Sequence, residues 1–377
     1  MGFWFGRKSA SAGGSAFVPV WLRGESGAGG FARGYEARFD EVYRDNPVGQ
    51  RSVRLVSGMM ASLTIDGPDE ALRLIDAELL ERVAAGLMLN GNAYVRLIVD
   101  GHDRPAELHA LRPERVSVTL DARGWPSGFE YRAGTQVSRI AGREALGRRQ
   151  VAHLKALNPG DDHYGLGCLA AAIAAASVHN RASRWNKALL DNAARPSGAL
   201  TYQPGDGSIL SGAQYDRLKG ELEDQFSGSA NAGRPLLLEG GLKWQAMSLT
   251  PADMDFVALK EGAARDIALA FGVPPVLVGL PGDATYANAR EAGRALLRQT
   301  VLPMAARVLA GLATLLGDWL GPVTLAVDED RLSELAEDRA RIWAQVSAAD
   351  FLSRAEKRVQ LGYPATSTGS GQAEEGE

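Results

Sequence analysis

The sequence lacks the features of a secreted or membrane-spanning protein. Cys168 is the only cysteine among 377 residues, so no disulfide can form within the chain, which is typical of a reducing compartment. The apolar run at the start, Met1–Phe5, is too short for a signal peptide, and Arg7 and Lys8 follow it. The longest alanine-rich run, Leu169–Val178, is about half the length that a bilayer requires. We therefore expect no transmembrane helix and no membrane partner.

An excess of positive charge is also absent. The chain holds 41 Lys and Arg against 45 Asp and Glu, a net charge of −4, with a pI of about 5.9. A free-standing nucleic-acid binder needs clustered cations, so this class is disfavoured, whereas a protein that surrounds DNA without gripping it is not. Residues 1–60 hold eight basic and five acidic side chains, and residues 320–377 hold six and eleven. We interpret the acidic C-terminal end as a solvated surface.

Motifs for catalysis are missing as well. The sequence contains no phosphate loop (Gly-x-x-x-x-Gly-Lys-Ser/Thr), no His-Glu-x-x-His and no Gly-x-Ser-x-Gly, and its five histidines are not at zinc-site spacing. Two patterns imitate a site. Gly165–Ala170 fits a dinucleotide fingerprint, but a loop separates it from the preceding strand, so we expect glycines that ease a helix start. Asp161–His163 is interpreted as a polar loop, and Cys168 as a small buried hydrophobe. We expect no catalytic residue, no cofactor and no metal.

Hydrophobic periodicity predicts an α+β fold. In the first 160 residues we expect a helix over 46–62, one helix from Pro68 to Asn90-Gly91-Asn92, a strand over Tyr94–Val99, a hairpin pairing Val116–Leu120 with Phe129–Arg132, and a strand over Gln150–Leu157.

Helices dominate the remainder. We expect helices at Leu166–Ala194, at Ser211–Phe226 with Ser211 as N-cap, at Thr250–Phe271, and at Tyr286–Leu320 with a kink at Pro303. Gly272 should take the left-handed position after the third of these, before Pro274-Pro275. Further predicted elements are a strand at Ala199–Gln203, a hairpin of Pro235–Leu238 with Lys243–Met247, a strand at Val323–Val327, and short helices at Asp330–Ser347 and Ala348–Gln360.

Two surfaces are candidates for contact with DNA. Arg181, Arg184 and Lys187 recur every three residues on the long helix, and they form either a solvated face, with Lys187 pairing to Asp191, or a stripe that faces DNA. The other candidate is the loop Gly279–Asn288, whose flexible and polar residues are Gly282, Asp283, Thr285, Tyr286 and Asn288. A plain interhelical loop is the alternative there.

Short motifs along residues 35–320 resemble the portal proteins of long-tailed phages, including those of phage-derived gene transfer agents. Each motif is weak alone, but their order and spacing together are specific. The motifs are Gly91-Asn92-Ala93-Tyr94, Leu111-Arg112-Pro113-Glu114-Arg115-Val116, Tyr164-Gly165-Leu166, Ala194-Arg195-Pro196-Ser197-Gly198, Gly233-Arg234-Pro235-Leu236, Glu239-Gly240-Gly241-Leu242-Lys243-Trp244, Met247-Ser248-Leu249, Phe271-Gly272-Val273-Pro274-Pro275 and Tyr286-Ala287-Asn288. The chain departs from the family at Gly167-Cys168-Leu169, where Ser-Pro-Leu is usual. The match over Glu239–Leu249 favours the gene transfer agent type over an infectious phage or a prophage remnant.

The resemblance implies a portal fold whose parts follow one another along the chain. These are a flexible N-terminal arm (1–34), an α+β wing (35–165), a descending stem helix (166–194), a clip (195–250), an ascending stem helix (251–272), a tunnel loop (273–288), a long kinked helix of the wing and channel (289–322), a short crown (323–362) and a disordered tail (363–377).

The same resemblance implies a structural protein of the virion. Such subunits form a ring, usually of twelve, at one capsid vertex, and double-stranded DNA is packaged and ejected through it. The implied partners are further copies of the chain, the large terminase, a head-completion adaptor and the major capsid protein, with assembly in the bacterial cytoplasm. Clip residues Arg234, Lys243, Trp244 and Gln245 are candidates for contact with the adaptor or a neighbouring subunit.

Two other classes remain as alternatives. The first is an enzyme or nucleotide-binding factor that processes nucleic acid for a mobile element, which would need a constellation that the sequence does not display. The second is a membrane-associated pore, against which the lack of an apolar span weighs.

Overall fold

The computed structural model describes residues 34–191, 198–202, 211–214, 216–217, 220, 242–246, 256–280, 286–332 and 335–363. Its helices are α1 (Tyr35–Phe39), η2 (Asp40–Arg44), α2 (Pro47–Ala61), α3 (Asp69–Leu72), α4 (Ala77–Asn90), η3 (Pro113–Arg115), α5 (Leu169–Asp191), α7 (Phe256–Ala270), η5 (Pro275–Val278), α8 (Tyr286–Leu296), η6 (Leu297–Val301), α9 (Leu302–Leu320), η7 (Glu329–Arg331), α10 (Ala336–Ala348) and α11 (Arg354–Gln360). Its strands are β1 (Ile65–Asp66), β2 (Asn92–Val99), β3 (Pro105–Leu111), β4 (Val116–Leu120), β5 (Pro126–Ala133), β6 (Gln136–Ala141), β7 (Val151–Lys155), β8 (Gly198–Tyr202), β9 (Leu242–Ala246) and β10 (Ala326–Val327).

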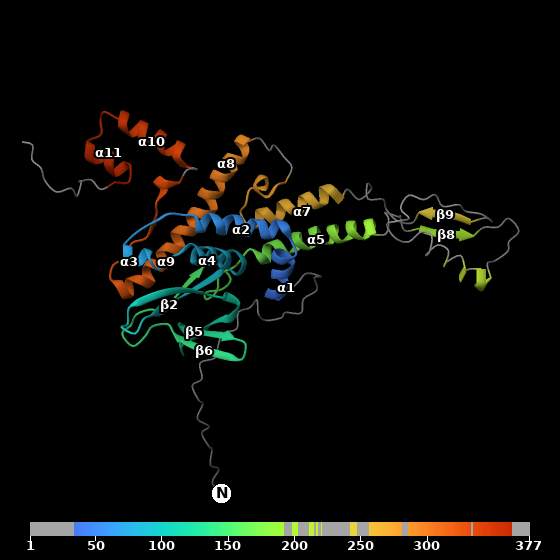
Figure 1. The fold of residues 1–377 in the computed structure, drawn as a ribbon, viewed down its shortest axis with the longest axis horizontal. Coiled ribbons are helices and arrows are strands. Elements are labelled where there is room, and N and C mark those ends of the chain that lie inside the picture. Colours follow the sequence, from blue (N-terminus) through green and yellow to red (C-terminus); the bar gives the residue numbers. More distant parts are fainter. Residues whose placement is uncertain are drawn as a thin grey trace, which may run out of the picture.

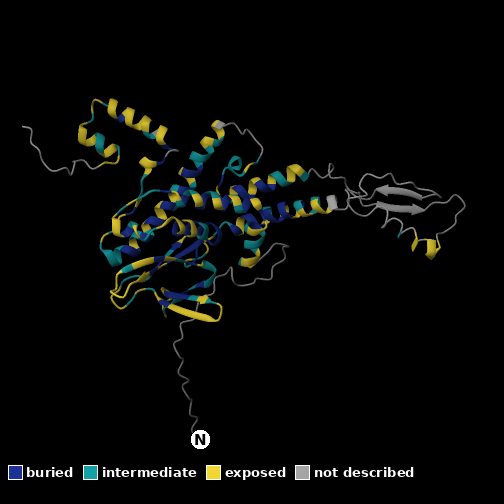
Figure 2. Ribbon diagram, viewed as in Figure 1, coloured by how far each residue is buried: buried dark blue, intermediate teal, exposed yellow. Residues whose placement is uncertain are grey.

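Small antiparallel sheets and a layer of helices make up the main body. One sheet has the order β3-β2-β7 and the other β4-β5-β6, while β1 pairs with β10 and β8 with β9. Helices α2 and α4 pack together, α4 covers β2 and α9 covers β7. Figure 1 shows the two three-stranded sheets below these helices, and Figure 2 shows the buried residues concentrated where they meet. The expected α+β class is confirmed.

Local signals place most helix ends. Asn46 caps α2 by accepting bonds from the amides of Val48 and Gly49, both at 3.0 Å, and Pro47 suits the first turn. Gly272, just past α7, has a φ of 65°, as expected for a left-handed residue at a helix end. The hydroxyl of Ser211 accepts a bond from the amide of Gln214 at 3.4 Å, so its role as an N-cap is confirmed. The expected cap Thr250 lies outside the described residues.

The single helix expected from Pro68 onward is wrong. The chain forms the short α3, turns at Leu74 and Ile75, and begins again as α4. The carboxylate of Asp76 accepts a bond from the amide of Leu79 at 2.7 Å, which makes it a new N-cap. The apolar residues continue at helical spacing across the break, because both short helices turn one face to the same core. This spacing concealed the break.

Several strands also differ from the expectation. β3 and β6 were missed because exposed polar residues interrupt their alternation, and β10 is shorter than expected. β9 pairs with β8, with Trp244 opposite Leu200. The other half of the expected hairpin, Pro235–Leu238, lies outside the described residues, as do most of the helix expected at 211–226 and both chain ends.

The long C-terminal helix is interrupted where its proline predicts. A π-helical turn, η6, separates α8 from α9 immediately before Pro303. Pro303 has no N–H to donate to the preceding turn, and a π turn accommodates this loss.

One described helix, Ala287–Leu320, is long and apolar enough to cross a bilayer by length and composition. The expectation that no segment has this length is therefore wrong. Val308, Leu312 and Leu316 on this helix are fully buried in the main core. Core packing accounts for this apolar stripe.

Three glycines, which we call the glycine junction (Gly91, Gly165 and Gly167), hold the body against the start of α5. Gly91 ends α4 in the left-handed conformation, with a φ of 82°. A methyl group on Gly165 would lie 2.0 Å from the carbonyl oxygen of Gly91, and one on Gly167 would lie 2.4 Å from that of Leu89. Only glycine permits such close approach of two backbones. The fingerprint-like spacing at Gly165–Ala170 is thus explained by backbone packing.

Backbone hydrogen bonds complete this junction. The amide of Cys168 donates to the carbonyl of Met88 at 2.7 Å, and the amide of Ala156 donates to that of Gly91 at 2.8 Å. Cys168 is half-buried, and burial raises the pKa of its thiol to about 11. A neutral thiol at the start of an apolar helix agrees with the interpretation of Cys168 as a small hydrophobe.

Asn92 ties the same region together from inside. Its side chain is fully buried; the oxygen accepts bonds from the amide of Gly165 at 2.8 Å and from Nε2 of His153 at 3.0 Å. Its amide nitrogen donates to Oδ1 of Asn90 at 3.0 Å and to the carbonyl of Gly165 at 3.2 Å. The end of α4, strands β2 and β7, and the loop before α5 are therefore joined by hydrogen bonds to one buried side chain.

An aromatic cluster lies beside Asn92, between the two three-stranded sheets. Tyr94 stacks on His153 with ring centroids 4.2 Å apart, and Phe129 meets Tyr94 edge-on at 5.7 Å. The hydroxyl of Tyr164 accepts a bond from the amide of Val118 at 2.8 Å. Asp161 accepts bonds from the amides that follow it, so the expected polar loop is confirmed.

We predict that Gly167→Ala lowers the free energy of unfolding by about 3 kcal/mol, because the new methyl group collides with backbone that cannot move independently. Urea unfolding followed by circular dichroism measures the change. Gly58→Ala is the matched control: Gly58 is exposed on α2 with open space around it, so alanine should raise stability by about 0.5 to 1 kcal/mol. Equal stabilities for the two variants would contradict the role of the junction.

Stability should also fall in mild acid because of His153. Burial lowers its pKa to about 3, with a smaller effect of Lys155, whereas an unfolded histidine titrates near 6.5. The unfolded chain therefore binds the proton more readily, and stability decreases as the pH falls below about 6.5. His153 keeps part of its surface exposed, so we expect a loss of about 1 to 2 kcal/mol between pH 7.5 and pH 5.

Replacement of the imidazole tests this origin. His153→Gln retains a donor for Asn92 but cannot titrate, so its stability should change less over the same pH range in urea unfolding. His109→Gln is the control, because His109 is exposed on β3. An unchanged pH dependence in His153→Gln would assign the acid sensitivity to other groups.

Candidate functional site

The most distinctive feature of the molecule is a pair of helices, α5 and α7, that projects from the body. The two helices pack side by side, and Figure 1 shows the β8–β9 ribbon beyond their outer end. Trp185 of α5 stacks on Phe256 of α7 with ring centroids 4.4 Å apart and an interplanar angle of 20°. Ala176, Ala264 and Ile267 are buried nearer the body. Small residues therefore bring the helices together at the root, and an aromatic pair joins them farther out.

A buried polar cluster fixes the root of this pair. The side-chain nitrogen of Asn46 donates to Oδ1 of Asn180 at 2.8 Å and to Nδ1 of His179 at 3.2 Å. Asn180 in turn donates to the carbonyl of Glu41 at 2.8 Å. Burial, together with Lys260, lowers the pKa of His179, which favours its neutral form. Residues at the start of α2 thus hold the middle of α5, and sequence reasoning missed them because the partners are more than 130 positions apart.

The three cations expected on α5 are all exposed. Arg181, Arg184 and Lys187 share one side of the helix, in agreement with their spacing. The guanidinium of Arg184 lies 3.8 Å from the carboxylate of Asp45, at the end of η2. This face therefore borders the body near its root, and its positive charge is partly balanced. Whether the stripe contacts DNA stays a prediction, and the side chain of Asp191 lies outside the described residues.

The other expected site residues are placed only in part. Lys243, Trp244 and Gln245 are consecutive on β9, opposite Thr201, Leu200 and Ala199 of β8, and Arg234 lies outside the described residues. Gly282, Asp283 and Thr285 of the expected tunnel loop also lie outside. Tyr286 begins α8, and Asn288 is exposed two residues later.

The helix that follows this loop is joined to the C-terminal helices by ion pairs. Arg290 contacts one carboxylate oxygen of Glu337 on α10 at 2.9 Å, and Arg294 contacts the other. The bond from Arg294, with the charge of Arg290, lowers the pKa of the Glu337 carboxyl. Sequence reasoning missed this connection, because the partners lie more than 40 positions apart.

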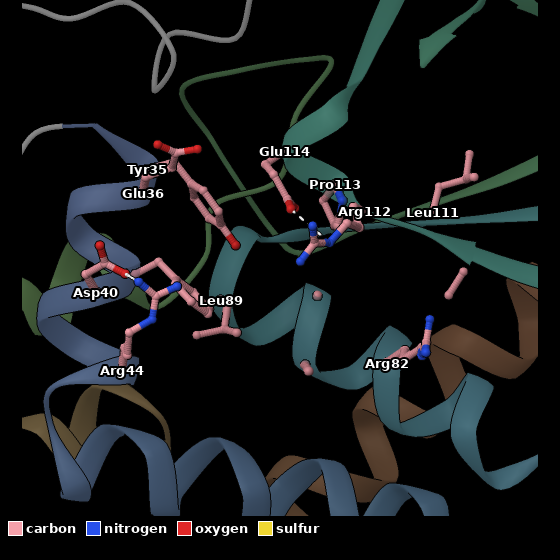
Figure 3. A pocket seen from close by; sticks show the side chains of 14 residues that line it. Tyr35, Glu36, Asp40, Arg44, Arg82, Leu89, Leu111, Arg112, Pro113 and Glu114 are labelled. Carbon is pink, nitrogen blue, oxygen red and sulfur yellow. Dashed lines mark ion pairs between the residues drawn. The ribbon is translucent and has the colours of Figure 1, made fainter. Parts of the chain in front are cut away.

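An open groove lies on the opposite side of the body from α8. It has a volume of about 720 Å³ and is bordered by α1 and η2 on one side and by α4, the end of β3 and η3 on the other. Figure 3 shows Arg44 paired with Asp40, at 2.6 Å, and Arg112 paired with Glu114, at 3.4 Å, at its rim. The volume lies in the range of ligand sites, roughly 300 to 1,000 Å³.

Metal ligands are not gathered anywhere in the part of the chain that the structure describes. No group of three or more His, Cys, Asp or Glu side chains there could hold a metal ion. The described geometry that stands out is therefore architectural: a braced helix pair, a ribbon at its end, and the helix α8, which ion pairs join to α10.

Comparison with known proteins agrees with this architecture. The family described as phage portal protein matches residues 47–362. The chain is 44% identical to a chain from the neck of a native gene transfer agent particle, computed with C12 symmetry; the match covers 94% of this chain and 97% of the other, with a TM-score of 0.70.

Two further relatives extend the comparison. An uncharacterized protein of Rickettsia bellii (strain RML369-C) is 40% identical over 294 residues, which are 76% of this chain and 74% of the relative. The crystal structure of an HK97 family phage portal protein from Corynebacterium diphtheriae is 16% identical, covers 76% of this chain and 93% of the other, and has a TM-score of 0.54. The last match concerns the fold alone. The resemblance found in the motifs and the expected portal fold are confirmed.

We predict that Trp185→Ala loosens the outer part of the helix pair. Removing the ring loses its stacking on Phe256 and the apolar area that it covers, so stability should fall by about 1 to 3 kcal/mol in urea unfolding. Trp125→Ala is the control, because Trp125 is 70% exposed in the loop between β4 and β5 and should change stability by less than about 0.5 kcal/mol. Equal losses for the two variants would contradict a bracing role for Trp185.

Proposed function

This chain belongs to the phage portal protein family, and we propose that its paired helices α5 and α7 form the stem of a ring around passing double-stranded DNA. Its function is that of a portal, the head–tail connector of a virion. DNA is packaged and ejected through such a connector at one capsid vertex. The observation that carries the proposal is the projecting, internally braced helix pair within a chain that matches the family over most of its length.

The ring should contain twelve subunits. A similar gene transfer agent neck was computed with C12 symmetry, and this chain matches it over nearly its whole length. That similarity also supports a particle of the gene transfer agent type. In a closed ring, each subunit would present the same stem surface to the channel, so a single exposed side chain is repeated twelve times around the DNA.

Weak electrostatic attraction between the protein and DNA suits a channel through which DNA slides. Each cation that contacts phosphate releases counterions and strengthens binding, so a dense cationic lining would hold DNA in place. The chain carries a net charge of −4, and Arg184 is balanced by Asp45. We place Arg181 and Lys187 of the stem, and Asn288 beside the tunnel loop, nearest the DNA. Gly282, Asp283, Thr285 and Tyr286 complete the proposed tunnel-loop contacts.

The β8–β9 ribbon is proposed as the clip, the part that meets other components. Arg234, Lys243, Trp244 and Gln245 would contact the neighbouring subunit, then the large terminase during packaging and the head-completion adaptor afterwards. The wing, 35–165, would face the major capsid protein, with assembly in the bacterial cytoplasm. The position of the ribbon beyond the outer end of the stem supports this assignment.

The portal family is structural, and we propose that this chain is not an enzyme. The main sequence pattern that could indicate nucleotide binding is the set of glycines at Gly165–Ala170. Close packing of two backbones explains these glycines without a nucleotide. A magnesium-dependent nuclease assay on the purified ring tests this point, and DNA cleavage that is lost with a carboxylate variant of this chain would overturn it.

The mass of the purified chain tests the ring itself. Light scattering should give about 480 kDa, twelve times the 40.1 kDa chain, and negative-stain images should show rings with a central hole. Trp244→Ala should abolish these rings while leaving the subunit folded, whereas Trp125→Ala in the wing should leave them intact. A folded chain that stays at the mass of one subunit would contradict the ring, and intact rings in Trp244→Ala would contradict the role of the clip.

A further inference from the structure

The groove between α1–η2 and α4–β3 has an apolar floor that nothing described covers. Leu89 and Leu111 line it and are themselves buried, whereas Ala85, Ala110 and Pro113 are only partly buried. Phe39 forms part of the opposite wall. In Figure 3 these elements enclose a space into which the ring of Tyr35 points. Apolar surface of this kind gains free energy when another apolar group covers it.

The charges at the rim indicate a neutral occupant. Three arginines line the groove, and each has a carboxylate partner within the chain. Arg44 lies 2.6 Å from Asp40, Arg82 lies 2.5 Å from Glu78, and Arg112 lies 3.4 Å from Glu114. These pairs are exposed and leave little net charge at the rim to attract a nucleic acid or another polyanion, whereas an apolar peptide segment needs none.

The chain itself carries such a segment next to the groove. The described structure begins at residue 34, and Tyr35 is already part of the groove wall. Upstream, Phe17–Leu22 reads Phe-Val-Pro-Val-Trp-Leu, an uncharged apolar run. Residues 23–33 connect the two and include four glycines. A glycine-rich connection of this length spans about 17 to 20 Å on average, enough to bring the run back to the groove.

We propose that Phe17–Leu22 docks into this groove of its own chain. The connection places the run at an effective concentration on the order of millimolar, so a weak intrinsic affinity suffices for occupancy. Docking would cover the apolar floor and join α1–η2 to α4. Because Glu41 of η2 and Asp45 just after it contact α5, the docked segment would brace the proposed stem through η2.

Disulfide trapping tests the docking directly in the full-length chain. In a Cys168→Ala background, Trp21→Cys is combined with Ala110→Cys in the groove, or with Val137→Cys on exposed β6 as the control. On mild oxidation, the first pair should form a disulfide within one chain, seen as faster migration in a non-reducing gel, and the control should not. No disulfide in the first pair would overturn the proposal. A disulfide between two chains would overturn the same-chain assignment and place the segment in the groove of a neighbour.

Limited trypsin digestion provides a second readout. Arg23 directly follows the docking run, so docking should slow cleavage after it. Ala85→Glu puts a charge on the groove floor and should raise the cleavage rate about tenfold, equivalent to docking weakened by about 1.4 kcal/mol. Val137→Glu is the control, and cleavage after Arg7 is the internal reference. An unchanged rate in Ala85→Glu, with the same thermal unfolding midpoint as the control, would overturn the proposal.

Neither the disulfide experiment nor the trypsin experiment depends on ring formation, so a failure of the docking proposal is distinguishable from a failure of the portal function.

Discussion

The approach of two backbones at the glycine junction is the constraint on which the rest of the structure depends. Gly165 and Gly167 pass so close to the end of α4 that a methyl group on either would overlap a carbonyl oxygen. Asn92 pairs with both the amide and the carbonyl of Gly165 at this contact. The contact sets the point at which α5 leaves the body. A shift here would be carried along a helix of 23 residues, or about 35 Å at 1.5 Å per residue.

A second polar centre, around Asn46, completes the orientation of α5. The junction holds the start of α5, and Asn46 with His179 and Asn180 holds its middle. Two buried, hydrogen-bonded centres along one helix restrict both its direction and its rotation, which apolar packing alone would leave less specific. In the proposed ring, the rotation of α5 would decide which of its side chains face the channel, so these centres would bear on the proposed function. The neutral state of His179 follows from the same burial.

Much of the fold could be predicted from local signals, and most of the failures involve partners that are distant in the sequence. Pro303 predicted the interruption of the long helix, and Gly91 and Gly272 predicted helix ends. By contrast, Asp76 divides a helix whose apolar spacing continues across the break, and β3 and β6 have exposed residues that obscure their alternation. For β3 and β6, the deciding partner is a neighbouring strand, which leaves no mark on local periodicity, whereas the Asp76 cap is local and was hidden by the apolar spacing that continues past it. The groove, the Asn46 cluster and the pairing of Glu337 with α8 were missed because their partners are distant in the sequence.

The sequence by itself determined the class of the protein: α+β, almost neutral, without catalytic motifs, and with the ordered motifs of a portal. It determined helix ends and turns because capping, proline geometry and left-handed glycine act within a few residues. Only the tertiary structure decided what those motifs do. Gly91-Asn92-Ala93-Tyr94 and Tyr164-Gly165-Leu166 lie about 70 positions apart, yet they meet at one contact. Close approach, shared hydrogen bonds and enclosed space are properties of pairs of distant residues, and these exist only once the chain has folded.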